Sequence, residues 1–262
     1  MRAAARAGTI LLDHWEQPIS GRAFKSTATD EVSDADRAAE TAILEVIRAA
    51  HPDDAIRSEE GGAAAGMSGR RWLVDPLDGT TNWLYRIPQW SVSIACLDGK
   101  GPLVGVVHDP VKREMFFAER GGGAWLARAE PGAVPDPGGS RRLAVTMVAD
   151  PALALVVTGF SYDPEERREQ ARREGHLIGR VRDVRRFGSA ALDLAWVAAG
   201  RMDGYAESFG EEWDWAAGRL LVEESGGRVS AIPGVRPGVP GILASGPNVH
   251  DDLLEIVRAR PA

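Results

Sequence analysis

The chain has 262 residues, which is enough to bury a substantial hydrophobic core in one large domain or in two packed lobes. Its composition, 44% hydrophobic and 26% charged residues, is typical of globular proteins and excludes an intrinsically disordered chain. The formal net charge of -7 argues against general binding of nucleic acid or of anionic membranes, since both require a cationic face.

The single cysteine and the short apolar runs narrow the class of protein further. Cys96 lies in an apolar stretch, so we expect a buried strand residue, and one cysteine cannot form an intramolecular disulfide. No run approaches the ~20 apolar residues that span a bilayer, and the apolar stretch after the basic start soon meets Asp13 and His14. We therefore expect a cytoplasmic protein without a membrane partner.

The first half of the chain predicts two amphipathic helices followed by an antiparallel meander. The helices are expected over residues 2–15 and 34–50, the second with Ser33 as its N-cap and ending before Pro52. Short runs with β-type composition follow, separated by Gly, Pro and Asp-Gly turns, over residues 72–74, 90–97, 101–108 and 114–119.

A stretch rich in Pro and Gly, residues 131–139, predicts a connection between two lobes, 1–140 and 141–262. Beyond it we expect a buried strand and three helices, over residues 152–159, 164–179, 189–199 and 214–225. Helices that alternate with short strands favour an α/β second half. The arginines between residues 167 and 186 are interleaved with acids, which favours a solvated helix face with ion pairs over nucleic-acid binding.

The segment from Asp75 to Thr81 carries the clearest chemical signal. Pro76 fixes its own backbone and pushes Asp75 into an extended conformation, so the carboxylates of Asp75 and Asp78 can converge beside a main-chain carbonyl. Such an all-oxygen set suits Mg²⁺. Gly79 allows close approach of a ligand, and the amides that follow it favour an anion such as phosphate.

Each acidic motif also has a structural interpretation when it is taken alone. Asp-Pro and Asp-Gly are common turn formers, and Asp often caps a helix, which would explain Asp214 at a helix start. Glu59-Glu60 could be a surface pair, and Asp36 could be a capping acid in the first turn of its helix. The functional interpretation depends on all of these acids acting together.

These motifs, in this order, resemble the inositol monophosphatase family of metal-dependent phosphatases over nearly the whole chain. The family pattern D-P-[ILV]-D-G-T-[TS]-N is matched by residues 75–82, and W-D-x-A-A-G by residues 213–218, with Glu224, Gly226 and Gly227 beyond it. The Glu-Glu pair, the Val-Ser-x-x-Asp loop after a lysine, and the Gly-Ser-Ala-Ala segment of residues 188–191 follow the family order.

The resemblance implies a role for each site residue. Glu59, Asp75 and the Leu77 carbonyl would hold one Mg²⁺, and Asp75, Asp78 and Asp214 a second, with a third, weaker ion near Glu59. Asp36 and Thr80 would orient and activate the attacking water, and Glu59 would be a catalytic residue as well as a metal ligand. The substrate would be bound by Asp78, Gly79, Thr80, Thr81, Ala190, Glu207 and Asp214, and Lys25 would lie near the metal loop.

The resemblance also implies a layered αβαβα sandwich, an α/β (α+β) fold with the site between an N-terminal α+β lobe and a C-terminal α/β lobe. It further implies a phosphoric monoester hydrolase, a homodimer and inhibition by lithium. Two or three buried cations would neutralise the phosphate and lower the pKa of a bound water. We expect a small phosphate monoester as the ligand, no nucleic acid, and stabilisation of the fold by Mg²⁺.

The sequence leaves the substrate open. Inositol monophosphate is favoured by Glu207 and by the complete metal set, whereas histidinol phosphate, an aminocyclitol phosphate or a sugar bisphosphate would use the same chemistry. A 3′-phosphonucleotide is the weakest alternative, because the sequence lacks the longer insertions expected around a nucleotide pocket. Glu211 and Glu212 depart from the less charged family segment, and would favour a cationic substrate group if they faced the pocket. A non-catalytic, regulatory metal-binding protein is the alternative from another class, although neither Thr80 nor any of the implied metal ligands is lost.

Overall fold

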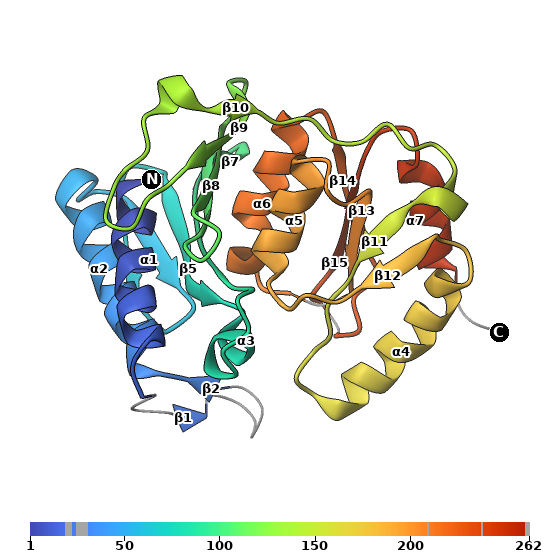
Figure 1. The fold of residues 1–262 in the computed structure, drawn as a ribbon, viewed down its shortest axis with the longest axis horizontal. Helices are drawn as coiled ribbons and strands as arrows, with labels where there is room; N and C mark the ends of the chain where they lie inside the picture. The colour runs from blue at the N-terminus through green and yellow to red at the C-terminus, as the bar shows by residue number, and fades with distance from the viewer. Residues whose placement is uncertain (19–22, 25–30, 209, 237, 260–262) are drawn as a thin grey trace.

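The chain folds into five layers in which helices alternate with sheets, and these layers are visible from left to right in Figure 1. The structure is a computed structural model that describes residues 1–18, 23–24, 31–208, 210–236 and 238–259. The order of layers confirms the predicted αβαβα sandwich. Over the described residues, no helix combines the length and the apolar composition that crossing a membrane requires.

The first layer contains α1 (Arg2–Trp15) and α2 (Asp34–Ala50), as the apolar spacing predicts. Their small and branched side chains, including Ala4, Leu11 and Ile43, are buried against the first sheet and against each other. Ser33 begins α2 with a capping box in which the Asp36 carboxylate accepts a hydrogen bond from the Ser33 N–H. Asp36 is therefore fixed at the helix start.

The second layer is an eight-stranded sheet of the described residues, in the order β10-β9-β8-β7-β6-β5-β3-β4. The meander predicted from residue 72 to 119 is confirmed, and sequence analysis missed the strand that continues it, β9. The parallel pair β3–β5 is the exception to antiparallel pairing. The strands are β3 (Ala55–Ser58), β4 (Ala63–Ala64), β5 (Arg71–Asp78), β6 (Ser91–Asp98), β7 (Gly101–Asp109), β8 (Glu114–Glu119), β9 (Gly123–Arg128) and β10 (Arg141–Arg142). A separate short pair joins β1 (Ala23–Phe24) and β2 (Glu31–Val32).

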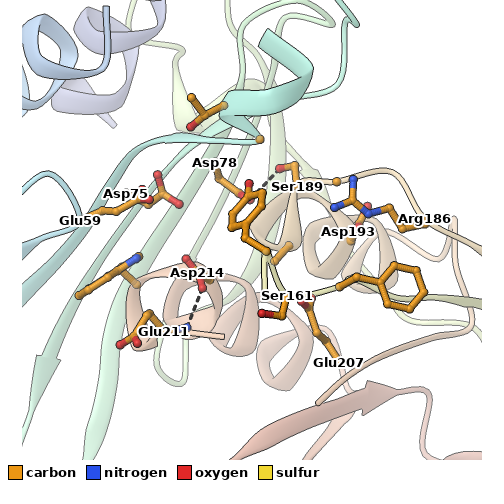
Figure 2. A pocket seen from close by; sticks show the side chains of 18 of the residues that line it. Glu59, Asp75, Asp78, Ser161, Arg186, Ser189, Asp193, Glu207, Glu211 and Asp214 are labelled. Carbon is orange, nitrogen blue, oxygen red and sulfur yellow. Dashed lines mark hydrogen bonds between the residues drawn. The ribbon is translucent and has the colours of Figure 1, made fainter. Parts of the chain in front are cut away.

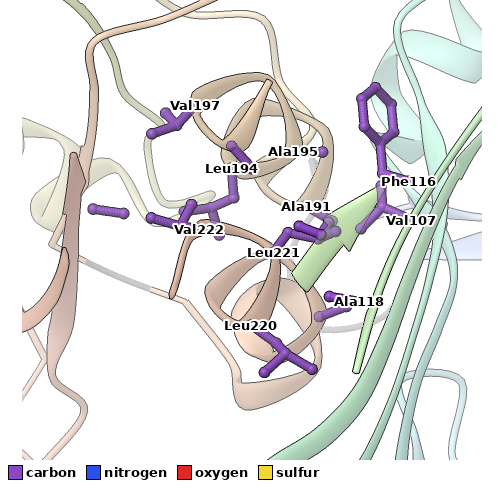
Figure 3. Packing of buried hydrophobic residues seen from close by; sticks show 14 of the residues in the cluster. Val107, Phe116, Ala118, Ala191, Leu194, Ala195, Val197, Leu220, Leu221 and Val222 are labelled. Atoms are coloured by element: carbon purple, nitrogen blue, oxygen red, sulfur yellow. The ribbon is translucent and has the colours of Figure 1, made fainter. Parts of the chain in front are cut away.

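The central layer contains α5 (Ala190–Ala198) and α6 (Glu212–Glu224), which pack on each other between the two sheets. Figure 3 shows their apolar side chains meeting those of β7 and β8, with Leu194, Leu221 and Phe116 almost fully buried. The short helix α3 (Thr80–Leu84) begins directly after β5. Burial of this continuous cluster is the main force that holds the two sheets around the central helices.

The last two layers are a five-stranded sheet of the described residues, in the order β12-β11-β13-β15-β14, and the outer helices. The elements are β11 (Leu155–Val157), β12 (Asp183–Arg185), β13 (Gly204–Glu207), β14 (Arg228–Ile232), β15 (Gly241–Ser245), α4 (Pro164–Ile178) and α7 (His250–Arg258). Strand β11 pairs in parallel with β12 and with β13, and the pairs β13–β15 and β14–β15 are antiparallel. The division of the chain into lobes at residue 140 stays a prediction.

Two predicted boundaries were wrong for local reasons. The strand expected from residue 152 begins only at Leu155, because Asp150 caps a 3-10 helix over Pro151–Leu153. The helix expected from Asp214 begins two residues earlier, with Glu211 as its N-cap and Asp214 as its third residue. Asp214 is therefore not the N-cap of α6.

Candidate active site

A pocket of about 420 Å³ opens where the ends of β5, α5 and α6 meet, and it collects residues from both halves of the chain. Figure 2 shows four carboxylates, of Glu59, Asp75, Asp78 and Asp214, on one part of its wall. They come from the segment after β3, from β5 and from the first turn of α6. Residues far apart in the sequence therefore form one acidic wall.

An irregularity in β5 explains how two residues of one strand reach the same pocket. Asp75 pairs with Ser93 and Asp78 with Ser91, so three steps along β5 match two along β6. In a regular strand, residues three apart point to opposite faces. The extra residue next to Pro76 removes that alternation, and both carboxylates line the pocket.

Protein donors hold three of these carboxylates. The Leu77 N–H donates to Asp75 Oδ1 over 3.0 Å. The Ser189 hydroxyl and the Ala191 N–H, both at the start of α5, donate to Asp78 Oδ2 over 2.7 Å. The Glu211 N–H donates to Asp214 Oδ2 over 2.7 Å, within a capping box.

The four acids also repel one another. Burial raises the pKa of Asp75 well above its usual value, and the charges of Glu59, Asp78 and Asp214 raise it further. Burial and the charges of Glu59 and Asp78 act on the pKa of Asp214 in the same direction. Burial raises the pKa of Asp78 to about 6, against the lowering effect of its bonds from Ser189 and Ala191.

The four carboxylates suit a hard divalent cation, although their oxygen atoms do not point to one common position. Among the described residues, no group of three or more Asp, Glu, His or Cys is arranged to hold a metal ion as it stands. Buried carboxylates with raised pKa values are nevertheless what such a cation neutralises, and oxygen is the ligand that Mg²⁺ prefers. The chemistry of the residues therefore fits the cation that sequence analysis predicted.

A second group of side chains lies beside the acids. The Thr80 hydroxyl lies 3.0 Å from the Leu77 carbonyl oxygen and 3.4 Å from Asp36 Oδ1. Asp36 is 1% exposed, and its other oxygen accepts from the Ser33 hydroxyl over 2.5 Å. Thr80 lines the pocket and Asp36 does not, and the Thr80 hydroxyl connects the Asp36 carboxylate to the pocket.

Gly79 makes the turn between β5 and α3 possible. Its φ of 95° lies in the left-handed region, which side chains disfavour. A Cβ atom at this position would lie 3.1 Å from the carbonyl oxygens of both Gln89 and Gly188. Glycine is thus required by the backbone angle and by the close approach of two chain segments.

The remaining predicted residues divide into three groups. Ala190, Glu207 and Glu211 line the pocket. Glu212 does not line the pocket, and its carboxylate pairs with Arg71 over 2.8 Å. Thr81 does not line it either, but forms a hydrogen bond with Tyr162, which is a lining residue. Lys25 lies outside the described residues.

Five charged residues of the pocket wall were not predicted from the sequence: Asp163, Glu166, Arg186, Asp193 and Arg236. Arg186 was grouped with the solvated arginines, a description that fits Arg172 and Arg185 with their acidic partners. The signal that could have identified Arg186 is its position two residues before Gly188, whereas Asp193 reads as an ordinary acid in the first turn of α5.

An αβαβα sandwich with a carboxylate-lined pocket beside its central helices defines a class of protein that other structures share. A native extragenic suppressor protein suhB from Bartonella henselae superimposes with a TM-score of 0.87, 34% identity, and coverage of 99% of this chain and 96% of that one. The inositol monophosphatase from Anabaena gives a TM-score of 0.82 at 36% identity, covering 99% and 93%.

Comparison of sequences assigns the chain to one family within this class. The model of the inositol monophosphatase family matches residues 1–261, and the chain belongs to this family. "Nus factor SuhB" of Pasteurella multocida is 38% identical over 98% of this chain and 94% of its own. "Inositol-1-monophosphatase" of Caulobacter vibrioides is 36% identical over 99% of each chain. The family predicted from the motifs is confirmed.

Proposed function

We propose that the protein is a Mg²⁺-dependent phosphatase that hydrolyses a small phosphate monoester, with inositol monophosphate as the favoured substrate. The observation that carries this proposal is that Glu59, Asp75, Asp78 and Asp214 line one pocket, which Thr80 also lines. Membership of the inositol monophosphatase family supports the same class of reaction. Histidinol phosphate, an aminocyclitol phosphate and a sugar bisphosphate are the alternative substrates.

The acids would hold the cations, and neighbouring groups would act on the reactants. Glu59, Asp75, Asp78, Asp214 and the Leu77 carbonyl would bind two or three Mg²⁺ ions. When bound, these ions neutralise the phosphate and lower the pKa of the attacking water. The Thr80 hydroxyl lies 3.4 Å from Asp36, so it can accept a hydrogen bond from the water while donating its own proton toward Asp36. The Gly79 and Thr80 amides would orient the phosphate.

The test is a phosphate-release screen over about a dozen phosphomonoesters, with and without Mg²⁺, on the natural chain and on Asp78→Asn. We expect release only with Mg²⁺, and a loss of at least about 100-fold in kcat for the variant, since a neutral amide is a poor cation ligand. An equal rate in both proteins would contradict the proposal. Circular dichroism would establish that the variant is folded, because an amide oxygen can still accept from Ser189.

A second candidate function follows from the names of relatives. Several are called Nus factor SuhB, and this name favours a regulatory role as the second candidate. If Asp78→Asn abolished phosphate release and a regulatory activity persisted, the two roles would be separate. The absence of a nucleic-acid partner, the homodimer, lithium inhibition and the cytoplasmic location stay predictions.

A further inference from the structure

The proposed metal ligands account for only part of the charged pocket wall, which is also lined by Asp163, Glu166, Arg186, Asp193, Glu207, Glu211 and Arg236. Figure 2 shows Glu59 and Asp75 on one side, and Asp193, Arg186 and Glu207 on the other. All five line the same pocket. The second group, which we call the distal group, has no role in holding a cation, so its chemistry must be explained by another part of the ligand.

Asp193 is the least explained member of the distal group. It follows Ser189 by four residues on α5, so both lie on one face of the helix, with Ser189 contacting Asp78 one turn nearer the metal acids. Asp193 is 2% exposed, and within the described part of the chain its Oδ1 has no hydrogen-bond partner. Another buried acid, Asp109, accepts from Lys112 over 3.0 Å, whereas Oε2 of Glu174 also lacks a hydrogen-bond partner among the described residues.

A buried carboxyl oxygen without a partner destabilises the fold, so a ligand is the natural candidate to satisfy it. Burial raises the pKa of Asp193 well above its usual value, and the charges of Asp78 and Glu207 add to this effect. Packing of the hydrophobic core does not explain an acid at Asp193, because a leucine of the same shape would fill this space without the cost of desolvating a carboxyl group.

The charges of Glu207 and Arg186 act on Asp193, and close contacts with other residues fix where these two side chains lie. A Cβ atom on Gly159 would lie 2.3 Å from Glu207 Oε2, and the Tyr205 hydroxyl donates to the same oxygen over 2.5 Å. A Cβ atom on Gly188 would lie 2.5 Å from Arg186 Nη1, so the guanidinium covers that glycine. Arg186 forms no ion pair with any residue that the structure describes, and its charge lowers the pKa of both acids.

We propose that Asp193 is a specificity-determining residue which, together with Glu207, binds neighbouring hydroxyl groups on the alcohol portion of the phosphate monoester. This inference rests on the proposed function and narrows its substrate class to polyol and cyclitol phosphates. A second phosphate would lie against two carboxyl groups, and an amine would lie against the Arg186 guanidinium. Neutral hydroxyl groups, which both donate and accept, suit carboxyl groups and a guanidinium together.

The experiment compares two substrates that differ in hydroxyl groups. Asp193→Leu keeps the side-chain shape and removes the hydrogen bonds, Asp193→Asn keeps part of them, and Asp109→Asn is the control at a buried acid outside the pocket. Each protein is assayed with inositol 1-phosphate and with p-nitrophenyl phosphate, which has no hydroxyl groups. Affinity for inositol 1-phosphate is measured by calorimetry without Mg²⁺, so that no turnover occurs.

We expect Asp193→Leu to lower kcat/KM for inositol 1-phosphate by about 10- to 100-fold, mainly through a higher KM. The kcat/KM for p-nitrophenyl phosphate should change by less than about twofold. Asp193→Asn should recover most of the loss, and the Tm of Asp193→Leu should not fall. Equal losses for both substrates, or no loss for either, would overturn the inference.

The proposed function can fail separately. If the natural chain releases phosphate from neither substrate, the proposed phosphatase activity is wrong. Calorimetry still decides the role of Asp193 in that case. Weaker binding of inositol 1-phosphate to Asp193→Leu than to the natural chain would support it, and equal or undetectable binding in both would refute it.

Discussion

Replacement of Gly79 by alanine tests whether the turn between β5 and α3 is built around a missing side chain. The left-handed φ of 95° would strain an alanine by about 1–2 kcal/mol. The new Cβ would also lie 3.1 Å from the Gln89 and Gly188 carbonyl oxygens, and displacing these two segments adds about 1–3 kcal/mol. The free energy of unfolding should therefore fall by about 2–5 kcal/mol.

Gly226→Ala is the matched control, since Gly226 has a φ of 87° and no heavy atom within 4 Å of an added Cβ. It carries only the backbone strain, so its effect on stability should be about 1–2 kcal/mol. Scanning calorimetry measures both variants, and each kcal/mol corresponds to about 2–4 °C in Tm for a chain of this size.

Activity provides the second measurement for the same pair of variants. Gly79 joins Asp78 to Thr80, so a shift of its backbone moves two proposed site residues, and a displacement of about 1 Å can reduce the rate about 100-fold. Gly226→Ala should keep the natural rate. Equal decreases in Tm for the two variants, with unchanged phosphate release in Gly79→Ala, would refute the assignment of Gly79 to a tightly packed turn.

Three further predictions concern charge. Mg²⁺ at millimolar concentration should raise Tm, and the increase should be larger at about pH 8 than at about pH 6. The raised pKa values of Asp75 and Asp214 mean that protons compete with the cation at the lower pH. An increase in Tm that is absent, or that is larger at low pH, would contradict this prediction. Burial raises the pKa of Glu174 from 4.5 to about 7, so the folded state binds more protons and the free energy of unfolding falls as pH rises between these values. Tm measured against pH should fall less steeply for Glu174→Gln, and an identical slope would be evidence against a buried acid. Replacing Glu211 and Glu212 with glutamine should change kcat/KM for inositol 1-phosphate and histidinol phosphate equally, because Arg57 and Arg71 already pair with them, whereas a selective loss for histidinol phosphate would show that they recognise an amine.

Sequence patterns predicted the regular elements best where one face alone is buried. The helices of residues 2–15 and 34–50 alternate apolar and polar faces, and their bounds match α1 and α2. Beyond residue 140, the strands β10, β12, β13, β14 and β15 and the helix α7 were not predicted. The Gly- and Pro-rich residues around β14 resemble loops, and β15 is a short strand buried along its whole length, which periodicity does not distinguish.

The candidate site shows a similar division. Motifs identified Asp75, Asp78 and Asp214, because these residue types occur at fixed spacings in the chain. No local pattern distinguishes Asp193 from an ordinary acid in the first turn of a helix. Its burial and its neighbours, Glu207 and Arg186, arise only when α5 packs beside β13, so tertiary structure was needed to identify it.

The packing of α5 on α6 determines how the two halves of the acidic wall meet. The start of α5 binds Asp78 through the Ala191 N–H, and the first turn of α6 carries Asp214. A Cβ atom on Gly218 would lie 2.5 Å from Leu194 Cβ, so the two helices touch where one residue has no side chain. The separation of Asp78 and Asp214 is therefore fixed by the apolar contacts in Figure 3. A substitution in this core should alter cation binding although it changes none of the proposed metal-binding residues.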